Sequence, residues 1–259
     1  MIKLVLCDID GTLIHPGERE VSPKVLEQVE RLQRKGLLFC PASGRQYNSL
    51  RGLFTTIADR IYYISNNGAV VLGPDKGGPL EEQIISKTAL PRELALRICE
   101  YILASDDFEL VIGGENTEYL VPKKINLTAH FEAMHYKVVT VERPEAVPED
   151  IVKVTAFCEA GVLEHYRALK AVWGNDCDVA VSGKRWIDFT LSNKGVGVKN
   201  LCAALEIPYK NVMAIGDNFN DLEMLDMVGY PVVMESAIEE IRSRSSVRCK
   251  KVEDVLAEL

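Results

Sequence analysis

The stretch Leu4-Val5-Leu6-Cys7-Asp8-Ile9-Asp10-Gly11-Thr12 places two carboxylates two residues apart where an apolar run stops. Consecutive apolar residues bounded by turn residues predict a buried parallel strand, whose carboxyl end opens on the ligand crevice of a doubly wound sheet. Side chains alternate along a strand, so Asp8 and Asp10 can share one side while Ile9 turns away. One carboxylate can then attack a substrate while its neighbour transfers protons. A capped strand end followed by an Asp-Gly turn is an alternative interpretation.

Further segments supply the groups that an acid pair needs to move a phosphoryl group. Ser43-Gly44-Arg45 follows the apolar run Leu37–Cys40, and offers a hydroxyl, backbone donors and a guanidinium, which suit phosphate oxygens. Lys194 stands at the start of a predicted helix and can carry positive charge into the site. The predicted strand Val212–Ile215 leads into Gly216-Asp217-Asn218-Phe219-Asn220-Asp221, a carboxylate-rich loop suited to a hard divalent cation.

Each segment also has a purely structural interpretation. Ser43 is suited to capping a helix near Gln46, Lys194 to lying solvated at a helix start, and Asp217 and Asp221 to capping a helix dipole. All four segments, however, occur in order, each at a predicted strand end or helix start, and that combination favours one common phosphoryl-transfer site.

These four segments resemble, in order, the motifs of haloacid dehalogenase (HAD) superfamily phosphatases: DxDGT, then Ser or Thr, then Lys, then GDxxND. The long segment between Ser43 and Lys194, together with Asn66-Asn67-Gly68-Ala69, resembles the Cof-type branch (subfamily IIB), in which a mobile α/β cap is inserted there. The resemblance spans the whole chain. Its small departures, Ile9 for a more usual Leu or aromatic residue, Ser43 for the commoner Thr, and a proline at position 41, remove no functional group.

The resemblance implies catalytic roles for two acids and a metal-binding role for a third. Asp8 is the expected nucleophile, which forms an aspartyl-phosphate, and Asp10 the expected general acid and then base. Asp10 then needs a pKa above that of Asp8, and so a different environment. The implied cofactor is Mg²⁺, held by Asp8, the backbone carbonyl of Asp10, and Asp217, where it offsets repulsion between the attacking carboxylate and the phosphate.

The resemblance also implies groups that bind the phosphoryl oxygens. Lys194 is expected to be catalytic as well as phosphate-binding, because its charge stabilises the transition state. Asp221 is expected outside the metal's direct ligands, where it orients Lys194 or the metal's water shell. Arg45 stays open between a substrate contact and a structural ion pair. The expected phosphate-binding residues are Ser43, Gly44, Arg45, Lys194 and Asn220.

The alternation of apolar runs and amphipathic stretches predicts an α/β fold with a doubly wound, Rossmann-like parallel sheet. A helix is expected from Ser22-Pro23 to Lys35, ending at Gly36. Further along, expected strands come in adjacent pairs, which indicates an antiparallel α+β cap; Ile187–Leu191 is expected to return the chain to the core. The expected domains are the first part of the core at 1–83, the substrate-selecting cap at 84–186, and the second part of the core at 187–259.

Composition limits the function classes. The chain has 259 residues, 47% of them hydrophobic, and a net charge of −8 without a long basic run, so neither nucleic acid nor an anionic membrane is an expected partner. No apolar run approaches the ~20 residues of a membrane span. The seven cysteines never form a C-x-x-C pair and most lie in apolar runs, which predicts reduced thiols. Because no targeting segment is evident either, we expect a cytoplasmic protein.

The expected function is hydrolysis of a small phosphorylated metabolite, such as a sugar phosphate or a phosphorylated organic acid like phosphoglycolate. A cap that closes over a crevice limits ligand size and excludes water. A phosphosugar mutase of the same superfamily shares every core residue and stays open as an alternative. A phospho-receiver module needs neither the second acid, Asp10, nor a cap, so both features disfavour it. A non-catalytic phosphosugar-binding protein does not need the intact pair Asp8 and Asp10, so this alternative is also disfavoured. The sequence does not indicate an oligomeric state.

Overall fold

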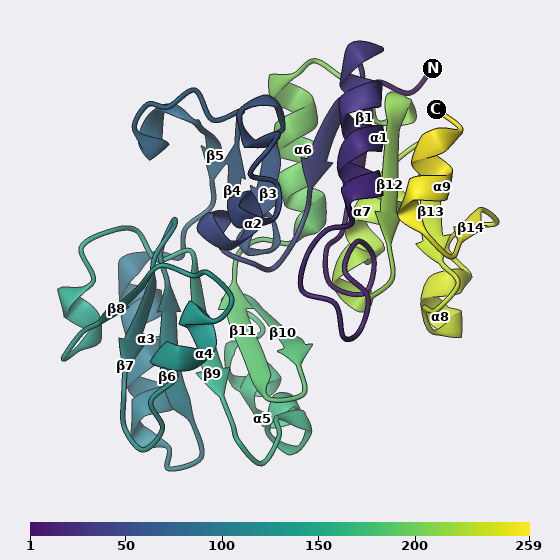
Figure 1. The fold of residues 1–259 in the computed structure, drawn as a ribbon. Coiled ribbons are helices and arrows are strands. Elements are labelled where there is room, and N and C mark those ends of the chain that lie inside the picture. The colour runs from purple at the N-terminus through teal and green to yellow at the C-terminus, as the bar shows by residue number, and fades with distance from the viewer. The chain divides into compact units, whose positions relative to one another are not determined.

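The computed structural model describes residues 1–259, which form two compact units. The first, here called the core unit, comprises Met1–Arg45, Leu50–Ser86 and Asn193–Leu259. The second, here called the insert unit, comprises Gln46–Ser49 and Lys87–Ser192. The chain therefore leaves the core unit and later returns to it, as it does around an inserted domain (Figure 1).

The core unit is built on a five-stranded parallel sheet with the strand order β14-β13-β12-β1-β2. From β1 the chain proceeds to β2 on one side and later to β12 on the other, so the order reverses at β1. Such a switch point is where a doubly wound sheet binds ligands. The strands are β1 (Leu4–Cys7), β2 (Leu38–Pro41), β12 (Val212–Gly216), β13 (Tyr230–Met234) and β14 (Arg248–Cys249).

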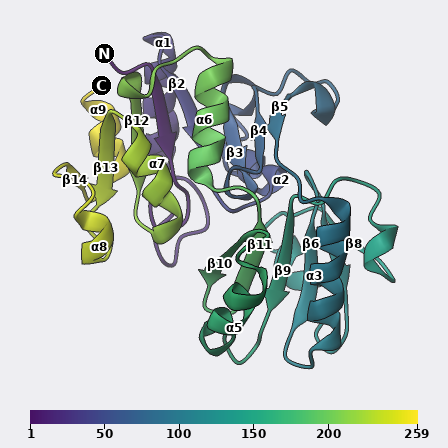
Figure 2. The ribbon, with the colours of Figure 1, turned by 180° about the vertical axis from the view of Figure 1, so that it is seen from behind.

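Helices cover both faces of this sheet, which confirms the predicted doubly wound architecture. Helices α1 (Pro23–Arg34) and α9 (Val252–Ala257) contact one another over one face (Figure 1). Helices α6 (Lys194–Ala204) and α7 (Leu222–Met227) contact one another over the opposite face (Figure 2). The other elements are helices α2 (Tyr47–Leu53) and α8 (Glu239–Arg242) and the three-stranded sheet β3 (Tyr63–Ser65), β4 (Val70–Leu72) and β5 (Ile84–Lys87).

Helix α1 shows how local sequence places these helices. The side chain of Ser22 accepts a hydrogen bond from the backbone N–H of Val25, and a proline occupies the first helical position. Val25, Val29 and Leu32 fall on one buried face, at the spacing of an amphipathic helix. The helix ends before Gly36, whose φ of 81° suits glycine. Both predicted ends of the helix are confirmed.

The insert unit contains a six-stranded sheet with the order β10-β11-β9-β6-β7-β8. Helices α3 and α5 pack on one face through a large apolar cluster, whereas α4 packs on the other face through a smaller cluster around Phe131. The helices are α3 (Arg92–Ala104), α4 (Thr128–Glu132) and α5 (Leu163–Trp173), and the strands are β6 (Glu109–Gly113), β7 (Glu118–Val121), β8 (Val138–Thr140), β9 (Lys153–Phe157), β10 (Asp178–Gly183) and β11 (Trp186–Thr190).

The expectation that Ile187–Leu191 returns the chain to the core is wrong. Strand β11 pairs antiparallel with both β9 and β10, so it belongs to the sheet of the insert unit. Its residues alternate, because Ile187 and Phe189 join the apolar cluster under α3 and α5 while Asp188 and Thr190 belong to the opposite face. The units divide between Ser86 and Lys87 and again between Ser192 and Asn193.

The insert sheet is mostly antiparallel, as expected, with one exception. Strand β8 lies parallel to β7, although the two follow each other in sequence. The connection between them contains α4 and is long enough for the crossover that parallel neighbours need. None of the helices is both long enough and apolar enough to span a membrane.

Candidate active site

The predicted functional groups of the core unit come together at the carboxyl edge of its sheet. Strands β2, β1 and β12 lie side by side and in parallel register, with Cys7 opposite both Pro41 and Ile215. Asp8 therefore emerges between the loops that carry Ser43 and Asp217. Parallel alignment thus converts segments far apart in sequence into neighbours at one edge.

A buried lysine lies between two of the acids. Lys194 has no exposed surface, and its ammonium donates hydrogen bonds to Oδ1 of Asp8 and, at 2.6 Å, to Oδ1 of Asp221. Helix α6 begins at this lysine because the side chain of Asn193 caps it by accepting from the N–H of Val196 at 3.0 Å. The predicted lysine is therefore held by two ion pairs and a capped helix.

Asp221 uses both of its carboxylate oxygens within the protein. Oδ1 accepts from Lys194, and Oδ2 accepts from the backbone N–H groups of Asp217 and Asn218 at 2.9 and 3.0 Å. Gly216 allows this arrangement, since a Cβ there would lie 2.6 Å from Cγ of Asp221. The structure thus places Asp221 where it orients Lys194 and shapes the loop that presents Asp217.

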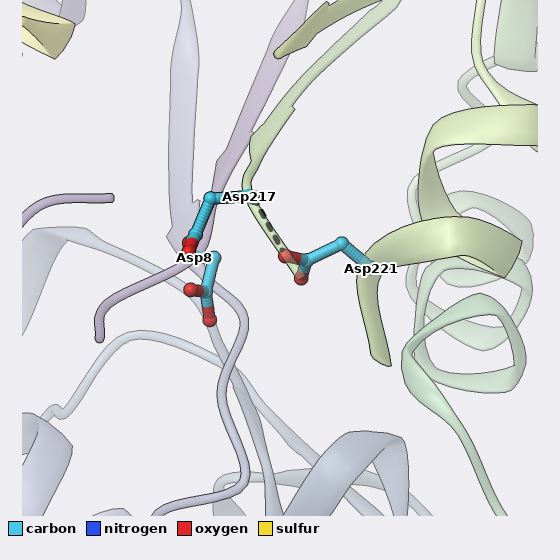
Figure 3. Close-up of side chains that lie close together, drawn as sticks. All are labelled: Asp8, Asp217 and Asp221. Atoms are coloured by element: carbon cyan, nitrogen blue, oxygen red, sulfur yellow. Dashed lines mark hydrogen bonds between the residues drawn. The ribbon is translucent and has the colours of Figure 1, made fainter. Parts of the chain in front are cut away.

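Asp8, Asp217 and Asp221 form a cluster in which one carboxylate oxygen from each lies within 4.8 Å of the others (Figure 3). Asp217 is held from the first motif, because Thr12 Oγ1 donates to its Oδ1 at 2.6 Å. Gly11 is also required here, because a Cβ at this position would collide with the Asp217 carboxylate. This all-oxygen donor set fits a hard divalent cation. Both oxygens of Asp221 are engaged by Lys194 and the loop backbone, while Lys194 also donates to Oδ1 of Asp8.

The charges in this cluster are unbalanced without a cation. Burial, followed by the nearby charge of Asp221, raises the pKa of Asp8 well above its usual range. Burial likewise raises the pKa of Asp217. Burial would lower the pKa of Lys194, but the charges of Asp221 and Asp8 outweigh it and hold that pKa above its usual value. Three carboxylates thus face one ammonium, and a divalent cation would offset the surplus negative charge.

Asp10 lies outside this acidic cluster in a different environment. Its two carboxylate oxygens accept from Arg45, Oδ2 from Nε at 2.8 Å and Oδ1 from Nη2 at 2.5 Å. The Asp10 side chain is 55% exposed, whereas Asp8 is buried. The arginine that the sequence left between a substrate contact and an ion pair is thus a bidentate partner of Asp10 in this structure.

Donors for phosphate oxygens line the same edge. The N–H groups of Ile9 and Asp10 donate to no backbone carbonyl, unlike those of Gly11 and Thr12 in the same loop. Ser43 is buried just after the neighbouring strand β2, and its Oγ accepts from the N–H of Arg45 at 3.2 Å. Free N–H groups at a strand end form the kind of concave donor set that binds anions.

Sequence reasoning missed two residues that the structure brings to this site. Thr12 stands within the first motif, but only the fold shows that its hydroxyl reaches Asp217. Asn67, noted only as part of a run typical of a family branch, has a side-chain oxygen that accepts from Nδ2 of Asn220 at 3.2 Å. Two consecutive asparagines before a glycine indicate a turn, and this was the only sequence signal that pointed to Asn67.

Comparison with known families agrees with this geometry. The family model described as haloacid dehalogenase-like hydrolase matches residues 5–257. The chain belongs to this family. The match includes both units, so the insert unit is part of the haloacid dehalogenase-like chain and not an unrelated fusion.

Individual relatives of this haloacid dehalogenase-like chain are named as phosphatases. It is 28% identical to the HMP-PP phosphatase of Serratia proteamaculans (strain 568), over 94% of this chain and 87% of that protein. It is 24% identical to the 5-amino-6-(5-phospho-D-ribitylamino)uracil phosphatase YbjI of Escherichia coli (strain K12), over 91% and 86%. Its fold matches the HAD subclass IIB sugar phosphatase BT4131 with a TM-score of 0.80, at 21% identity and covering 99% and 98% of the two chains.

Proposed function

We propose that this hydrolase is a magnesium-dependent phosphatase that hydrolyses a small phosphomonoester through an aspartyl-phosphate on Asp8. The observation that carries the proposal is the buried Asp8 carboxylate, held by Lys194 at the switch point of the sheet beside Asp217. Relatives named as phosphatases of HMP-PP and of 5-amino-6-(5-phospho-D-ribitylamino)uracil support a small phosphorylated substrate. A sugar phosphate or a phosphorylated organic acid such as phosphoglycolate belongs to that class.

In the first step, a carboxylate oxygen of Asp8 attacks phosphorus while the bond from phosphorus to the leaving oxygen breaks. Lys194 keeps Asp8 oriented and places a positive charge beside the oxygens that gain charge in the transition state. Asp10 gives its proton to the leaving oxygen, which departs as an alcohol. Asp10 is exposed beside Arg45 whereas Asp8 is buried, so the two acids have different environments.

In the second step, Asp10 takes a proton from water, and the water oxygen attacks phosphorus. The bond from phosphorus to Asp8 then breaks, which releases inorganic phosphate and restores the carboxylate. Ser43, Arg45, Asn220 and the N–H group of Gly44 are proposed to bind the phosphoryl oxygens in both steps. Bound between Asp8, Asp217 and the backbone carbonyl of Asp10, Mg²⁺ would supply the positive charge that lets an anionic nucleophile approach a phosphate dianion.

Two further features of the protein belong to this proposal. The insert unit, Gln46–Ser49 and Lys87–Ser192, is proposed to select the substrate, because it is the large addition that a bare phosphoryl-transfer sheet does not need. A cytoplasmic location is proposed because all seven cysteines are free and buried, as is usual in a reducing compartment.

The test is phosphate release from a panel of small phosphomonoesters, with and without Mg²⁺, by the native protein and by Asp8→Asn. We expect turnover that requires Mg²⁺ and falls by at least about 10³-fold in Asp8→Asn, because an amide cannot form the phosphorylated intermediate. Asp59→Asn is the matched control, since Asp59 is 70% exposed on the core unit and is expected to leave turnover unchanged.

The panel includes glucose 1-phosphate and glucose 6-phosphate, because a mutase shares the same core residues. Interconversion of these sugars without net phosphate release would replace the phosphatase by a phosphosugar mutase. Saturable turnover retained in Asp8→Asn would overturn the nucleophile, and binding without any turnover would indicate a phosphosugar-binding protein.

A further inference from the structure

The turn after β3 adopts an unusual backbone conformation close to the proposed phosphate groups. Asn66, Asn67 and Gly68 have consecutive positive φ angles of 49°, 51° and 89°. The left-handed region is unfavourable for most residues but is tolerated by asparagine and is open to glycine. The run Asn-Asn-Gly is therefore suited to a turn in which all three residues have a left-handed backbone conformation that few other residue types adopt.

The backbone of this turn is tied to the loop that carries Ser43. The N–H of Asn66 donates to the carbonyl of Arg45, and the N–H of Asn67 donates to the carbonyl of Ser43, both at 2.9 Å. Gly44 faces the Asn67 side chain so closely that a Cβ would lie 3.1 Å from its Nδ2. The turn thus binds the carbonyls of Ser43 and Arg45 and packs closely against Gly44 between them.

The side chain of Asn67 reaches a second motif. Its Oδ1 accepts from Nδ2 of Asn220 at 3.2 Å, which joins residues that are far apart in sequence. Asn220 lies on the loop that also presents Asp217 and is exposed, so little else restrains its amide. One hydrogen bond therefore determines how Asn220 is turned.

The same turn packs against the beginning of helix α6. A Cβ on Gly68 would collide with the carbonyl of Asn193 and would lie 3.0 Å from the backbone nitrogen of Gly197. Asn193 is the residue that caps the helix and immediately precedes Lys194. The turn consequently touches three of the segments that carry the proposed site.

We propose that Asn67 is a positioning residue that sets the phosphate-binding geometry, by fixing the amide of Asn220 against the Ser43–Gly44 loop. This inference rests on the proposed phosphatase function. Asn67 acts through its neighbours: its oxygen is occupied by Asn220, while its backbone N–H is occupied by Ser43. Loss of its side chain is expected to weaken the binding of phosphate without unfolding the core unit.

The experiment uses Asn67→Gly, because glycine keeps the left-handed backbone and removes only the amide. Glu206→Gly is the matched control: Glu206 is also a left-handed, non-glycine residue of the core unit, with φ of 53°, but it is exposed and lies at the far end of α6. We expect Asn67→Gly to lower kcat/KM about 10-fold, because the loss of one hydrogen bond in an active site has an effect of about this size. Glu206→Gly is expected to leave kcat/KM unchanged.

A double-mutant cycle with Asn220→Ala separates positioning from independent effects. If Asn67 acts through Asn220, the double variant loses no more than either single variant, whereas independent roles multiply to about 100-fold. Native kcat/KM in Asn67→Gly, or multiplied losses in the double variant, would overturn the proposal. A lowered Tm with unchanged kcat/KM would show a merely structural role and would also overturn it.

Binding of inorganic phosphate in the presence of Mg²⁺, followed by calorimetry, provides a readout that needs no turnover. Asn67→Gly is expected to raise the Kd for phosphate about 10-fold relative to Glu206→Gly, again the size of one such hydrogen bond. If no phosphomonoester is hydrolysed, the proposed function fails, but this binding measurement still decides the role of Asn67. Equal Kd values in the two glycine variants would contradict it.

Discussion

Both units of the protein bury a lysine among carboxylates, but they do so in different ways. In the core unit Lys194 donates directly to Asp8 and Asp221, and its side chain has no exposed surface. The acids come from the ends of strands and from loops, where the chain is free to bring charges together. Direct ion pairs with hydrogen bonds are what makes buried charge tolerable.

In the insert unit the corresponding residues belong to neighbouring strands of the sheet. Lys153 Nζ lies 3.8 Å from Oδ2 of Asp188, whose Oδ1 accepts from Thr155 at 2.6 Å. Glu118 is 1% exposed, and its Oε2 has no hydrogen-bond partner. Gly113 separates Glu118 and Lys153 on the intervening strand, so both side chains extend over a position without a side chain.

The difference lies in the partners of the buried acids, because Asp8 accepts directly from Lys194 whereas Oε2 of Glu118 has no hydrogen-bond partner. Burial raises the pKa of Glu118 to about 7, even though the charge of Lys153 opposes the shift. The nearby charges of Asp188 and Glu149 contribute smaller parts of this rise. Burial therefore raises the pKa of an acid in both clusters, and the core cluster in addition brings together three carboxylates whose oxygens suit a hard cation.

The largest effect is expected from removing the lysine of each cluster. Lys194→Met leaves Asp8 and Asp221 buried without their cation, and breaking such a buried pair costs about 3–5 kcal/mol of unfolding free energy. Lys153→Met removes a more distant partner, so we expect a smaller cost of about 1–3 kcal/mol.

Both tryptophans, Trp173 and Trp186, lie in the insert unit, so their fluorescence during urea unfolding follows that unit, while far-ultraviolet circular dichroism follows both. Lys153→Met is expected to shift the fluorescence transition, and Lys194→Met mainly the circular-dichroism transition. The exposed Lys250 and Lys184 provide the controls Lys250→Met and Lys184→Met, which should change the unfolding free energy by less than about 0.5 kcal/mol. A larger loss in Lys153→Met than in Lys194→Met would reverse the comparison.

The next effect is a pH dependence of the insert unit that comes from Glu118. Below the ordinary pKa of 4.5, Glu118 is protonated in both the folded and unfolded chain. As pH rises, the unfolded chain releases the proton first, so the unfolding free energy falls until about pH 7 and is level above it. The size of the shift corresponds to about 3 kcal/mol at most.

The measurement is the fluorescence-detected unfolding free energy between pH 4.5 and 8 for the native protein and Glu118→Gln. Glu118→Gln removes the titrating group, so the difference between the two proteins should grow across this interval. Glu100→Gln, at an exposed position on α3 of the same unit, should follow the native protein. Parallel curves for the native protein and Glu118→Gln would show that Glu118 keeps an ordinary pKa.

Features of the fold that depend on local sequence were predictable. Buried parallel strands appear as unbroken apolar runs, and the acids of the core unit follow them directly, so Asp8 and Asp217 could be placed at one sheet edge from sequence. Ile187–Leu191 was assigned to the wrong unit because a short alternating strand carries no mark of its partner. Its pairing depends on β9 and β10, which a single sequence does not reveal.

The polar contacts between segments were not predictable in the same way. A lone acid on a strand, such as Glu118, normally faces solvent, and nothing local distinguishes it from a buried one. The hydroxyl of Thr12 and the amide of Asn67 likewise acquire their partners only when distant segments pack. Sequence thus indicated the chemistry of the core site, whereas its supporting contacts required three-dimensional placement.

The smallest effect compares two hydroxyl–carboxylate pairs of equal length. Thr12 donates to Asp217, and Thr155 donates to Asp188, each at 2.6 Å. Thr12→Val keeps the shape of the side chain and removes the donor that orients a proposed metal-binding acid. Loss of such an orienting partner typically weakens metal affinity at least about 10-fold, so we expect the Mg²⁺ concentration for half-maximal turnover to rise about 10-fold.

Thr155→Val is the matched substitution in the insert unit. It should lower the fluorescence-detected unfolding free energy by about 1–2 kcal/mol, since the pair is buried, and leave the Mg²⁺ requirement unchanged. Thr12→Ser retains the hydroxyl and should restore the native Mg²⁺ requirement, which excludes a volume effect at position 12. If Thr12→Val and Thr155→Val shifted the Mg²⁺ requirement equally, the cation would not be held by Asp217. The two clusters would then have to be distinguished by something other than metal binding.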